Sequence, residues 1–312
     1  MKTTVKKGIE ISAISLGTVQ LGINYGISNA GGKPSREKAF EILDCAIKNG
    51  INSLDTAAAY GDSEETIGSW LAARNFEKKP FIATKAHSLD FGSLDSLRKS
   101  MRQQVESSKK NLGLEQLPLF MLHHFDEFLK APDEMVTVMQ ELKASGDVAM
   151  TGASAYSFHD YNQLAATGFD AVQIPLNIFD WTQIENGGLK ALEQSGMIVF
   201  ARSIYLQGLV FKKPEDIEMH MDFCREPLEK FCYLCEKYKL SPAQLSLSYA
   251  LSLPEITSLV LGSETVQQVQ QNVELAESAV QLTAAQLAEI RDCFLNIDSR
   301  VLNPSTWVKP KA

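Results

Sequence analysis

Short apolar runs recur along the whole chain, and amphipathic stretches separate them. Runs of this length and composition are typical of strands that are buried on both faces of a parallel sheet. The eight predicted strands are Ile14–Leu16, Ile51–Leu54, Phe81–Thr84, Leu119–Leu122, Val148–Ser154, Ala171–Ile174, Met197–Ala201 and Ser258–Leu261.

The stretches between the strands have the spacing of amphipathic helices. Residues Arg36–Lys48, for example, place Phe40, Leu43 and Ile47 on one face. Ser63 is a suitable N-cap for the helix that follows it. The predicted helices are Arg36–Lys48, Glu64–Ala73, Leu94–Leu112, Asp133–Ala144, Ser157–Thr167, Leu189–Ser195, Pro227–Lys239, Pro242–Leu251, Thr265–Ala276 and Ala284–Phe294.

This alternation predicts a single α/β domain over residues 1–312. Eight strand–helix units favour a closed (β/α)8 TIM barrel over an open sheet. The residues beyond a minimal barrel fall into an N-terminal segment, a long loop after the seventh strand (Ser203–Arg225), and the C-terminal helix with its tail. No GxGxxG or GxxxxGK(S/T) motif follows any strand, which argues against an open dinucleotide-binding sheet and against a P-loop.

Composition narrows the class of protein. The chain of 312 residues has a net charge of −8, so it lacks the basic face that nucleic-acid binding needs. The apolar runs are too short to cross a bilayer, and no secretory signal is present. Five scattered cysteines indicate reduced thiols and a cytoplasmic location. Cys232 and Cys235 form an isolated CxxC, so we expect no metal site, and we expect His159 and His220 to be solvated.

Polar residues stand where the predicted strands end, and in a barrel of this kind those ends form the active-site face. Asp55 and Tyr60 follow the second strand, Lys85 follows the third, and His123 follows the fourth. Each residue alone is compatible with packing or solvation. An acid, a phenol, an amine and an imidazole at three successive strand ends indicate a catalytic cluster.

Several of these segments resemble the aldo-keto reductases, and the resemblance runs over nearly the whole chain. The resembling segments are GINSLDTAAAYGDSEETIG (50–68), FIATK (81–85), LFMLHH (119–124), VQIPLN (172–177) and GSETVQQVQQN (262–272). The first is similar to a long and specific family signature around an aspartate and a tyrosine. The resemblance implies that Asp55, Tyr60, Lys85 and His123 are the catalytic residues.

Carbonyl reduction explains this set of residues, because it needs a hydride at carbon and a proton at oxygen. A free tyrosine, with a pKa near 10, is a reluctant proton donor. A lysine ammonium beside the phenol lowers its pKa, and a carboxylate keeps that lysine charged where it is partly buried. Asp55 would therefore hold Lys85, Lys85 would tune Tyr60, and Tyr60 would donate the proton, while His123 orients the substrate carbonyl.

The resemblance also implies a nicotinamide cofactor, either NADP(H) or NAD(H). The implied contacts are Ser154, Gln173 and Asn177 at the carboxamide, Ser203 and Leu206 at the pyrophosphate, Gly262 and Ser263 at a phosphate, and Gln268 and Asn272 near the adenine.

Three positions depart from the family pattern. Arg202 replaces a tyrosine that usually stacks on the nicotinamide, so its guanidinium either stacks on the reduced cofactor or reaches an anionic group of the substrate. Glu264 stands where a basic residue usually binds the adenosine 2′-phosphate, and no Lys or Arg occurs between Lys239 and Arg291. We therefore predict a weakened preference for NADPH. Ala155 replaces an asparagine, which removes one carboxamide contact.

We therefore expect an NAD(P)H-dependent oxidoreductase that reduces a small aldehyde or ketone to an alcohol. Two other functions stay open. One is a barrel that binds the nicotinamide as a regulatory or redox-sensing module without turnover. The other is a lyase or isomerase in which Lys85 forms a Schiff base. The chain has no heptad or internal repeat that calls for a protein partner.

Overall fold

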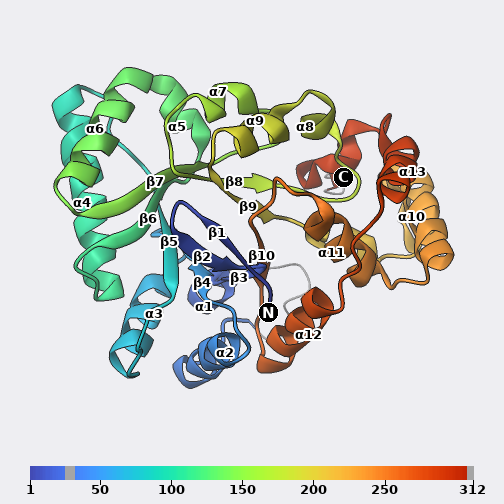
Figure 1. Cartoon of the computed structure of the whole chain (residues 1–312), viewed down its shortest axis with the longest axis horizontal. Helices are drawn as coiled ribbons and strands as arrows, with labels where there is room; N and C mark the ends of the chain where they lie inside the picture. The colour runs from blue at the N-terminus through green and yellow to red at the C-terminus, as the bar shows by residue number, and fades with distance from the viewer. Residues whose placement is uncertain (25–31, 308–312) are drawn as a thin grey trace.

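A closed barrel of eight parallel strands forms the centre of the computed structural model, which describes residues 1–24 and 32–307 (Figure 1). The strands are β3 (Ile14–Gly17), β4 (Ser53–Asp55), β5 (Phe81–Ala86), β6 (Leu117–Leu122), β7 (Val148–Ser154), β8 (Ala171–Pro175), β9 (Ile198–Arg202) and β10 (Ser258–Gly262). They follow one another in chain order around the barrel, and β10 closes it by pairing with β3. The predicted (β/α)8 barrel is confirmed, and each strand overlaps its predicted range.

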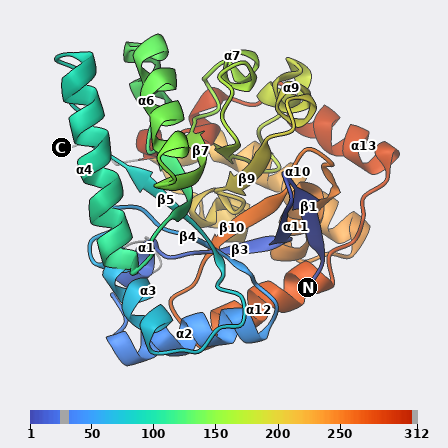
Figure 2. The same ribbon diagram turned by 60° about the vertical axis from the view of Figure 1, so that its left-hand side comes forward.

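Helices surround the barrel on its outside (Figures 1 and 2). They are α1 (Val19–Gly22), α2 (Arg36–Lys48), α3 (Ser63–Ala72), α4 (Leu94–Leu112), α5 (Phe125–Lys130), α6 (Pro132–Ala144), α7 (Tyr161–Ala165), α8 (Thr182–Glu185), α9 (Gly188–Gln194), α10 (Arg225–Tyr238), α11 (Pro242–Ser252), α12 (Val266–Glu277) and α13 (Ala284–Phe294). Every predicted helix has a counterpart. The short helices α1, α5 and α8 were missed because four to six residues are too few for a helical period. None of the helices described is long and apolar enough to cross a membrane.

The long connection after β9 contains three 3-10 helices that the sequence analysis treated as loop. These are η1 (Leu206–Phe211), η2 (Pro214–Asp216) and η3 (Met219–Cys224), while η4 (Ser299–Leu302) and η5 (Pro304–Trp307) follow α13. The Arg300 guanidinium lies 4.5 Å from the centroid of the Phe223 ring, and His220 Nε2 lies 2.9 Å from the carbonyl oxygen of Trp307. The C-terminal tail is therefore packed on this connection. Residues 308–312 of the predicted tail lie outside the described residues.

An N-terminal hairpin, which the sequence analysis did not predict, covers one end of the barrel. Its antiparallel strands are β1 (Thr3–Lys6) and β2 (Ile9–Ser12), and Figure 1 shows them in front of the barrel strands. Ile11 has no exposed surface and packs with the side chains that fill the barrel. The hairpin therefore closes the barrel at this end.

Side chains alternate between the inside and the outside of each barrel strand, and this produces two cores. Larger apolar residues on the outside of the strands pack against the helices. The interior cluster comprises Ile11, Ala83, Leu119, Met121, Ala171, Ile198 and Phe200. The same alternation decides which residues line the open end of the barrel.

Two local predictions were wrong. Ser63 does not cap α3, because its hydroxyl accepts from Thr56 Oγ1 at 2.9 Å and donates to the carbonyl oxygen of Thr18 at 3.1 Å. It thereby ties α3 to the ends of β3 and β4. His159 is buried rather than solvated, and its Nδ1 accepts the backbone N–H of Tyr156 at 2.9 Å.

Replacing Ile11 with alanine tests the role of the hairpin as a closing plug. We expect the free energy of unfolding to fall by about 2–5 kcal/mol, because the substitution leaves a cavity in a packed interior. Val5→Ala is the matched control, because Val5 lies on the same hairpin and is 68 % exposed. Urea denaturation followed by circular dichroism measures both effects. An Ile11→Ala effect as small as that of the control would show that the hairpin does not contribute to the core.

Candidate active site

The candidate active site is the last layer of inward-facing residues before the open end of the barrel. Along three strands, and directly after a fourth, the residue two places beyond an interior core residue is polar. The pairs of core and polar residue are Ala83 and Lys85, Met121 and His123, Ala171 and Gln173, and Phe200 and Arg202. Asp55 ends β4 beside them. The period of a β-strand therefore carries these polar groups to one face of the barrel.

Asp55 and Lys85 form a buried ion pair in this layer. Lys85 Nζ donates to Asp55 Oδ1 at 2.6 Å and to the carbonyl oxygen of Thr56 at 2.9 Å. Gln173 Nε2 donates to the same Asp55 oxygen at 2.7 Å. Lys85 is 0 % exposed and Asp55 is 5 % exposed. Because an isolated buried ammonium is very costly, the pair and its hydrogen bonds make this position tolerable for a lysine.

Tyr60 lies on the turn between β4 and α3, beside Lys85. The Lys85 Nζ is 5.1 Å from the centroid of the Tyr60 ring. Gly22 lets the Tyr60 turn pack against α1, because a Cβ at Gly22 would lie 1.6 Å from the carbonyl oxygen of Tyr60. Gly61, the next residue of the turn, adopts φ +58°, a conformation that favours glycine. Burial raises the pKa of Tyr60, and the charge of Lys85 opposes that rise. Lys85 thus acts in the predicted direction, but burial is the larger effect and the phenol stays protonated at neutral pH.

His123 completes the cluster from the end of β6. Its ring makes an edge contact with the Tyr60 ring at a centroid distance of 5.7 Å. Burial, and then the charge of Lys85, lower the pKa of His123 to about 3. The imidazole is therefore neutral at physiological pH and can donate one N–H hydrogen bond. Its buried Nδ1 has no hydrogen-bond partner among the described residues. The structure thus brings all four predicted catalytic side chains together.

Three buried side chains next to the ion pair carry polar atoms that a nicotinamide carboxamide could use. Ser154, Gln173 and Asn177 are at most 5 % exposed. The Gln173 Nε2 is engaged by Asp55, and Asn177 Oδ1 accepts the backbone N–H of Phe179 at 3.0 Å. Within the described residues no hydrogen bond uses Ser154 Oγ, Gln173 Oε1 or Asn177 Nδ2. A carboxamide presents both donors and an acceptor, so this set fits it.

The residues after β10 form a polar turn that leads into α12. Asn272 Nδ2 donates to Ser263 Oγ at 3.2 Å, and the backbone N–H of Glu264 donates to Gln268 Oε1 at 2.6 Å. Gly262 ends β10 with an exposed backbone. All five residues predicted to contact the phosphate and adenine therefore lie at one helix entrance, where backbone N–H groups favour anions.

The connection after β9 is strained where the pyrophosphate is predicted to lie. Ser203, Leu206 and Gln207 have φ values of 65°, 44° and 51°. Residues with a Cβ seldom adopt this conformation, and strain of this kind gathers at functional sites. Ser203 and Leu206 were predicted as pyrophosphate contacts, whereas Gln207 was not, because backbone strain leaves no pattern in a sequence.

Sequence reasoning missed the end of the first barrel strand. It considered strand ends only from the second strand onward and so did not include Thr18 and Gln20, which follow β3. A Cβ on Gly262 would lie 2.5 Å from Gln20 Nε2, so the Gln20 side chain lies against that glycine. Gln20 Oε1 is buried without a hydrogen-bond partner among the described residues. The rule that identified the other strand ends could have found both residues.

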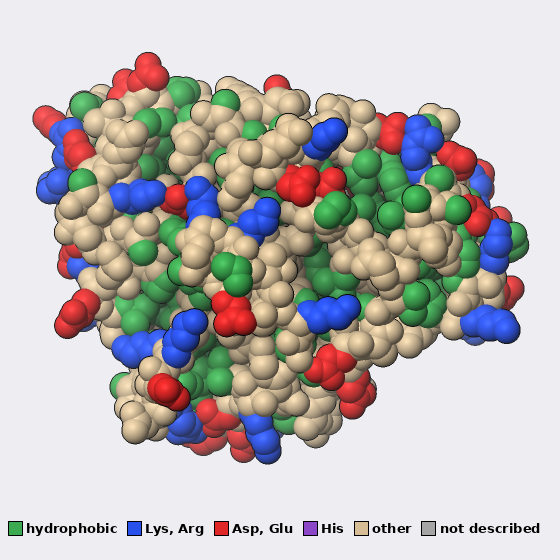
Figure 3. All heavy atoms as spheres, viewed as in Figure 1, with side chains coloured by type: hydrophobic (Ala, Val, Ile, Leu, Met, Phe, Trp, Pro, Cys, Tyr) green, Lys and Arg blue, Asp and Glu red, His purple; other side chains and the backbone are tan. Residues whose placement is uncertain are grey.

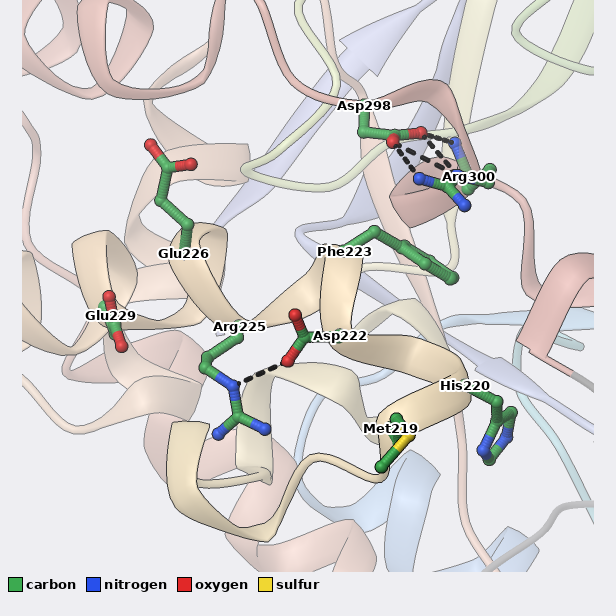
Figure 4. Close-up of a pocket in the computed structure, with 9 residues that line it drawn as sticks. All are labelled: Met219, His220, Asp222, Phe223, Arg225, Glu226, Glu229, Asp298 and Arg300. Atoms are coloured by element: carbon green, nitrogen blue, oxygen red, sulfur yellow. Dashed lines mark hydrogen bonds and ion pairs between the residues drawn. The ribbon is translucent and has the colours of Figure 1, made fainter.

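A separate hollow of about 570 Å³ lies between η3, α10 and η4 (Figure 4). Its walls are strongly charged, but its arginines already have partners. Arg225 Nε donates to Asp222 at 2.9 Å, and Arg300 pairs with Asp298 at 2.6 Å. No predicted site residue lines this hollow.

The face at the closed end of the barrel has a mixed charge. Figure 3 shows the face with the N-terminal hairpin, on which acidic and basic side chains are interspersed and no histidine is visible. In the part of the chain that the structure describes, no three His, Cys, Asp or Glu residues are placed to hold a metal ion, and all five cysteines are free thiols.

Comparison with known proteins identifies the family. The model of the aldo/keto reductase family matches residues 13–294. The aldo-keto reductase str7 of Strobilurus tenacellus is 29% identical, with 90% of this chain and 88% of that protein covered. The L-glyceraldehyde 3-phosphate reductase of Escherichia coli K12 is 27% identical, covering 91% and 89%. The holo form of an aldo-keto reductase from Bacillus halodurans superposes with a TM-score of 0.73 at 21% identity, covering 94% and 96%.

This chain belongs to the aldo/keto reductase family, whose members are oxidoreductases that use NAD(P)H. The resemblance noted in the sequence is therefore confirmed at the level of the family.

Replacing Asp55 with asparagine tests the energetic role of the ion pair. We expect the free energy of unfolding to fall by about 3–5 kcal/mol, because the buried Lys85 ammonium loses its counter-charge. The matched control is Asp298→Asn, which removes the charged partner of the exposed Arg300 and should have a much smaller effect, because water screens an exposed pair. Chemical denaturation at neutral pH gives both values. Equal losses in the two variants would contradict a special role for the buried pair.

Proposed function

We propose that this oxidoreductase reduces an aldehyde or ketone to an alcohol with hydride from NADPH or NADH. The observation that carries the proposal is the contact of a protonated phenol, Tyr60, with the buried Asp55–Lys85 pair and with the neutral imidazole of His123. A bound reduced nicotinamide supplies the hydride. The side chains of this protein supply the proton and hold the carbonyl.

Tyr60 is the proton donor in this mechanism. As hydride reaches the carbonyl carbon, negative charge grows on the oxygen, and the Tyr60 O–H transfers its proton to that oxygen. The phenolate that remains is stabilised by the ammonium of Lys85, which Asp55 keeps charged and in place. The alcohol product thus gains one hydride at carbon and one proton at oxygen.

His123 orients the substrate. Its imidazole is neutral, so it donates a hydrogen bond from Nε2 to the carbonyl oxygen, since Nδ1 is buried. This bond places the oxygen beside the phenol of Tyr60, because the two rings are in edge contact. A neutral imidazole also does not compete with Tyr60 as the acid.

The cofactor site proposed here follows the strand ends. Ser154, Gln173 and Asn177 would hold the carboxamide, and Ser203 and Leu206 would lie along the pyrophosphate. The turn after β10, with Gly262, Ser263, Glu264, Gln268 and Asn272, would hold the adenosine end. An aldehyde substrate is also consistent with the name of the Escherichia coli relative, which reduces L-glyceraldehyde 3-phosphate.

The other two functions have less support. A Schiff base needs a lysine amine that is neutral and accessible, whereas Lys85 is fully buried and donates to Asp55 and Thr56. No observation favours a regulatory barrel without turnover, because the four reactive groups are in place. A cytoplasmic location stays a prediction from the free thiols.

Aldehyde-dependent oxidation of NADPH or NADH tests the proposed reaction directly, and Tyr60→Phe tests the proton donor. We expect kcat to fall by about 10²- to 10⁴-fold in this variant, the range for loss of a general acid. Cofactor affinity should not change, because the ring remains. Tyr233→Phe is the control, because that residue is 56 % exposed on α10. A Tyr60→Phe variant with wild-type kcat would assign the proton to another group.

The role of Glu264 is tested by the ratio of the NADPH and NADH affinities. We expect NADH to bind at least as tightly as NADPH, because a carboxylate repels a 2′-phosphate and can accept a hydrogen bond from a 2′-hydroxyl. Glu264→Arg should shift the ratio about fivefold toward NADPH, the effect of one exposed charge pair.

Tryptophan fluorescence titration at fixed salt measures both affinities. Glu274→Arg makes the same change of charge on the exposed side of α12 and should leave the ratio unchanged. Much tighter binding of NADPH than of NADH by the unaltered protein would contradict the prediction.

A further inference from the structure

Arg202 is a half-buried cation at the open end of the barrel that no carboxylate neutralises. Within the described residues it takes part in no ion pair, whereas Lys85 and the arginines of the hollow in Figure 4 all have acidic partners. Its hydrogen bonds go to the carbonyl oxygen of Ala155 at 3.2 Å and to Ser203 Oγ at 3.4 Å. These bonds use two of the five N–H donors of a guanidinium. The remaining donors are available to a ligand.

An aromatic ring holds the Arg202 guanidinium in one place. Its Cζ lies 5.1 Å from the centroid of the Tyr156 ring. Tyr156 stacks in turn on His124 and Phe158, with interplanar angles of 13° and 8°. The backbone N–H of Tyr156 is fixed by the buried Nδ1 of His159. A guanidinium that is already positioned loses little conformational freedom when it binds an anion.

Arg202 is close enough to the reaction centre to touch the same small molecule. It belongs to the layer of inward-facing residues that holds Lys85 and His123, two places beyond the core residue Phe200. Burial raises the pKa of Tyr60 and lowers that of His123, and the charge of Arg202 makes a smaller contribution that opposes the first shift and adds to the second.

Arg202 is an unbalanced positive charge, although the whole chain carries a net charge of −8. Asp55 balances the charge of Lys85 at 2.6 Å, whereas Arg202 forms no ion pair among the described residues. A partly buried cation without a counter-charge attracts a ligand of the opposite charge.

We propose that Arg202 binds an anionic group on the substrate, so that the substrates of this enzyme are small carbonyl compounds that carry a carboxylate or a phosphate. The inference rests on the proposed reductase function and adds the class of substrate to it. Both groups present two oxygens to the planar fork of a guanidinium. Tyr60 and His123 would then hold the carbonyl oxygen while Arg202 holds the charged end.

The alternative role for Arg202, stacking on the nicotinamide, fits this geometry less well. The guanidinium already lies over the Tyr156 ring, with Cζ 5.1 Å from its centroid. A fixed positive charge would also repel the oxidised ring, which is cationic, and so would oppose hydride transfer to the substrate.

The test compares two pairs of aldehydes that differ in charge and little in shape. The first pair is 4-carboxybenzaldehyde and 4-formylbenzamide, and the second is glyceraldehyde 3-phosphate and glyceraldehyde. We expect kcat/KM of the unaltered enzyme to be about 10- to 100-fold higher for the charged member of at least one pair, the value of one charge-assisted hydrogen bond. The pair with the larger ratio distinguishes a carboxylate site from a phosphate site.

Arg202→Gln should reduce that ratio to about one, mainly through KM, and Arg202→Lys should retain part of it. The control is Arg300→Gln, which makes the same change of charge next to Asp298 and should leave the ratio unaltered. Cofactor affinity should be the same in all four proteins. Equal kcat/KM values for charged and neutral aldehydes in the unaltered enzyme would overturn the proposal. A weaker cofactor with unchanged ratios in Arg202→Gln would assign Arg202 to the cofactor instead.

Failure of the proposed function gives a different result, in which no aldehyde of either pair is reduced. Calorimetric binding of 4-carboxybenzyl alcohol and of 4-(hydroxymethyl)benzamide to the protein with cofactor then decides the inference on its own. Tighter binding of the anion that is lost in Arg202→Gln supports an anion site. Equal binding of the two alcohols rejects it.

Discussion

The ion pair between Asp55 and Lys85 is the interaction on which the rest of the site depends. A lysine with no exposed surface can stay charged only beside a counter-charge, and Asp55 supplies it from the neighbouring strand. The same carboxylate oxygen accepts from Gln173 on β8, across the barrel interior. Side chains from β4, β5 and β8 therefore meet at Asp55 Oδ1. This meeting point fixes the Lys85 ammonium, beside which the Tyr60 ring lies.

Burial has opposite consequences for the two groups that face this pair. It keeps the proton on the phenol of Tyr60 and keeps a second proton off the imidazole of His123. One group is therefore an acid with a proton to give, and the other is a neutral donor. The two groups have different roles because burial makes an uncompensated charge costly on either of them. Arg202, which forms no ion pair among the described residues, is the exception.

The strands and the four reactive residues could be predicted from the sequence because each left a local signal. Apolar runs marked the strands, and the polar residues that ended them marked the open face of the barrel. Features made by packing left no such signal. The hairpin was missed because its strands of four residues are too short for a clear period, and the stack of His124, Tyr156 and Phe158 exists only once β6 and β7 are adjacent. The net direction of the Tyr60 pKa shift likewise depends on burial, which the sequence could not supply.

Ile11 closes one end of a barrel whose interior is filled by side chains, so polar groups can meet a ligand only at the opposite end. The proposed substrate and cofactor would then approach the reactive residues from the same side. A substitution at that rim would therefore affect the access of both molecules.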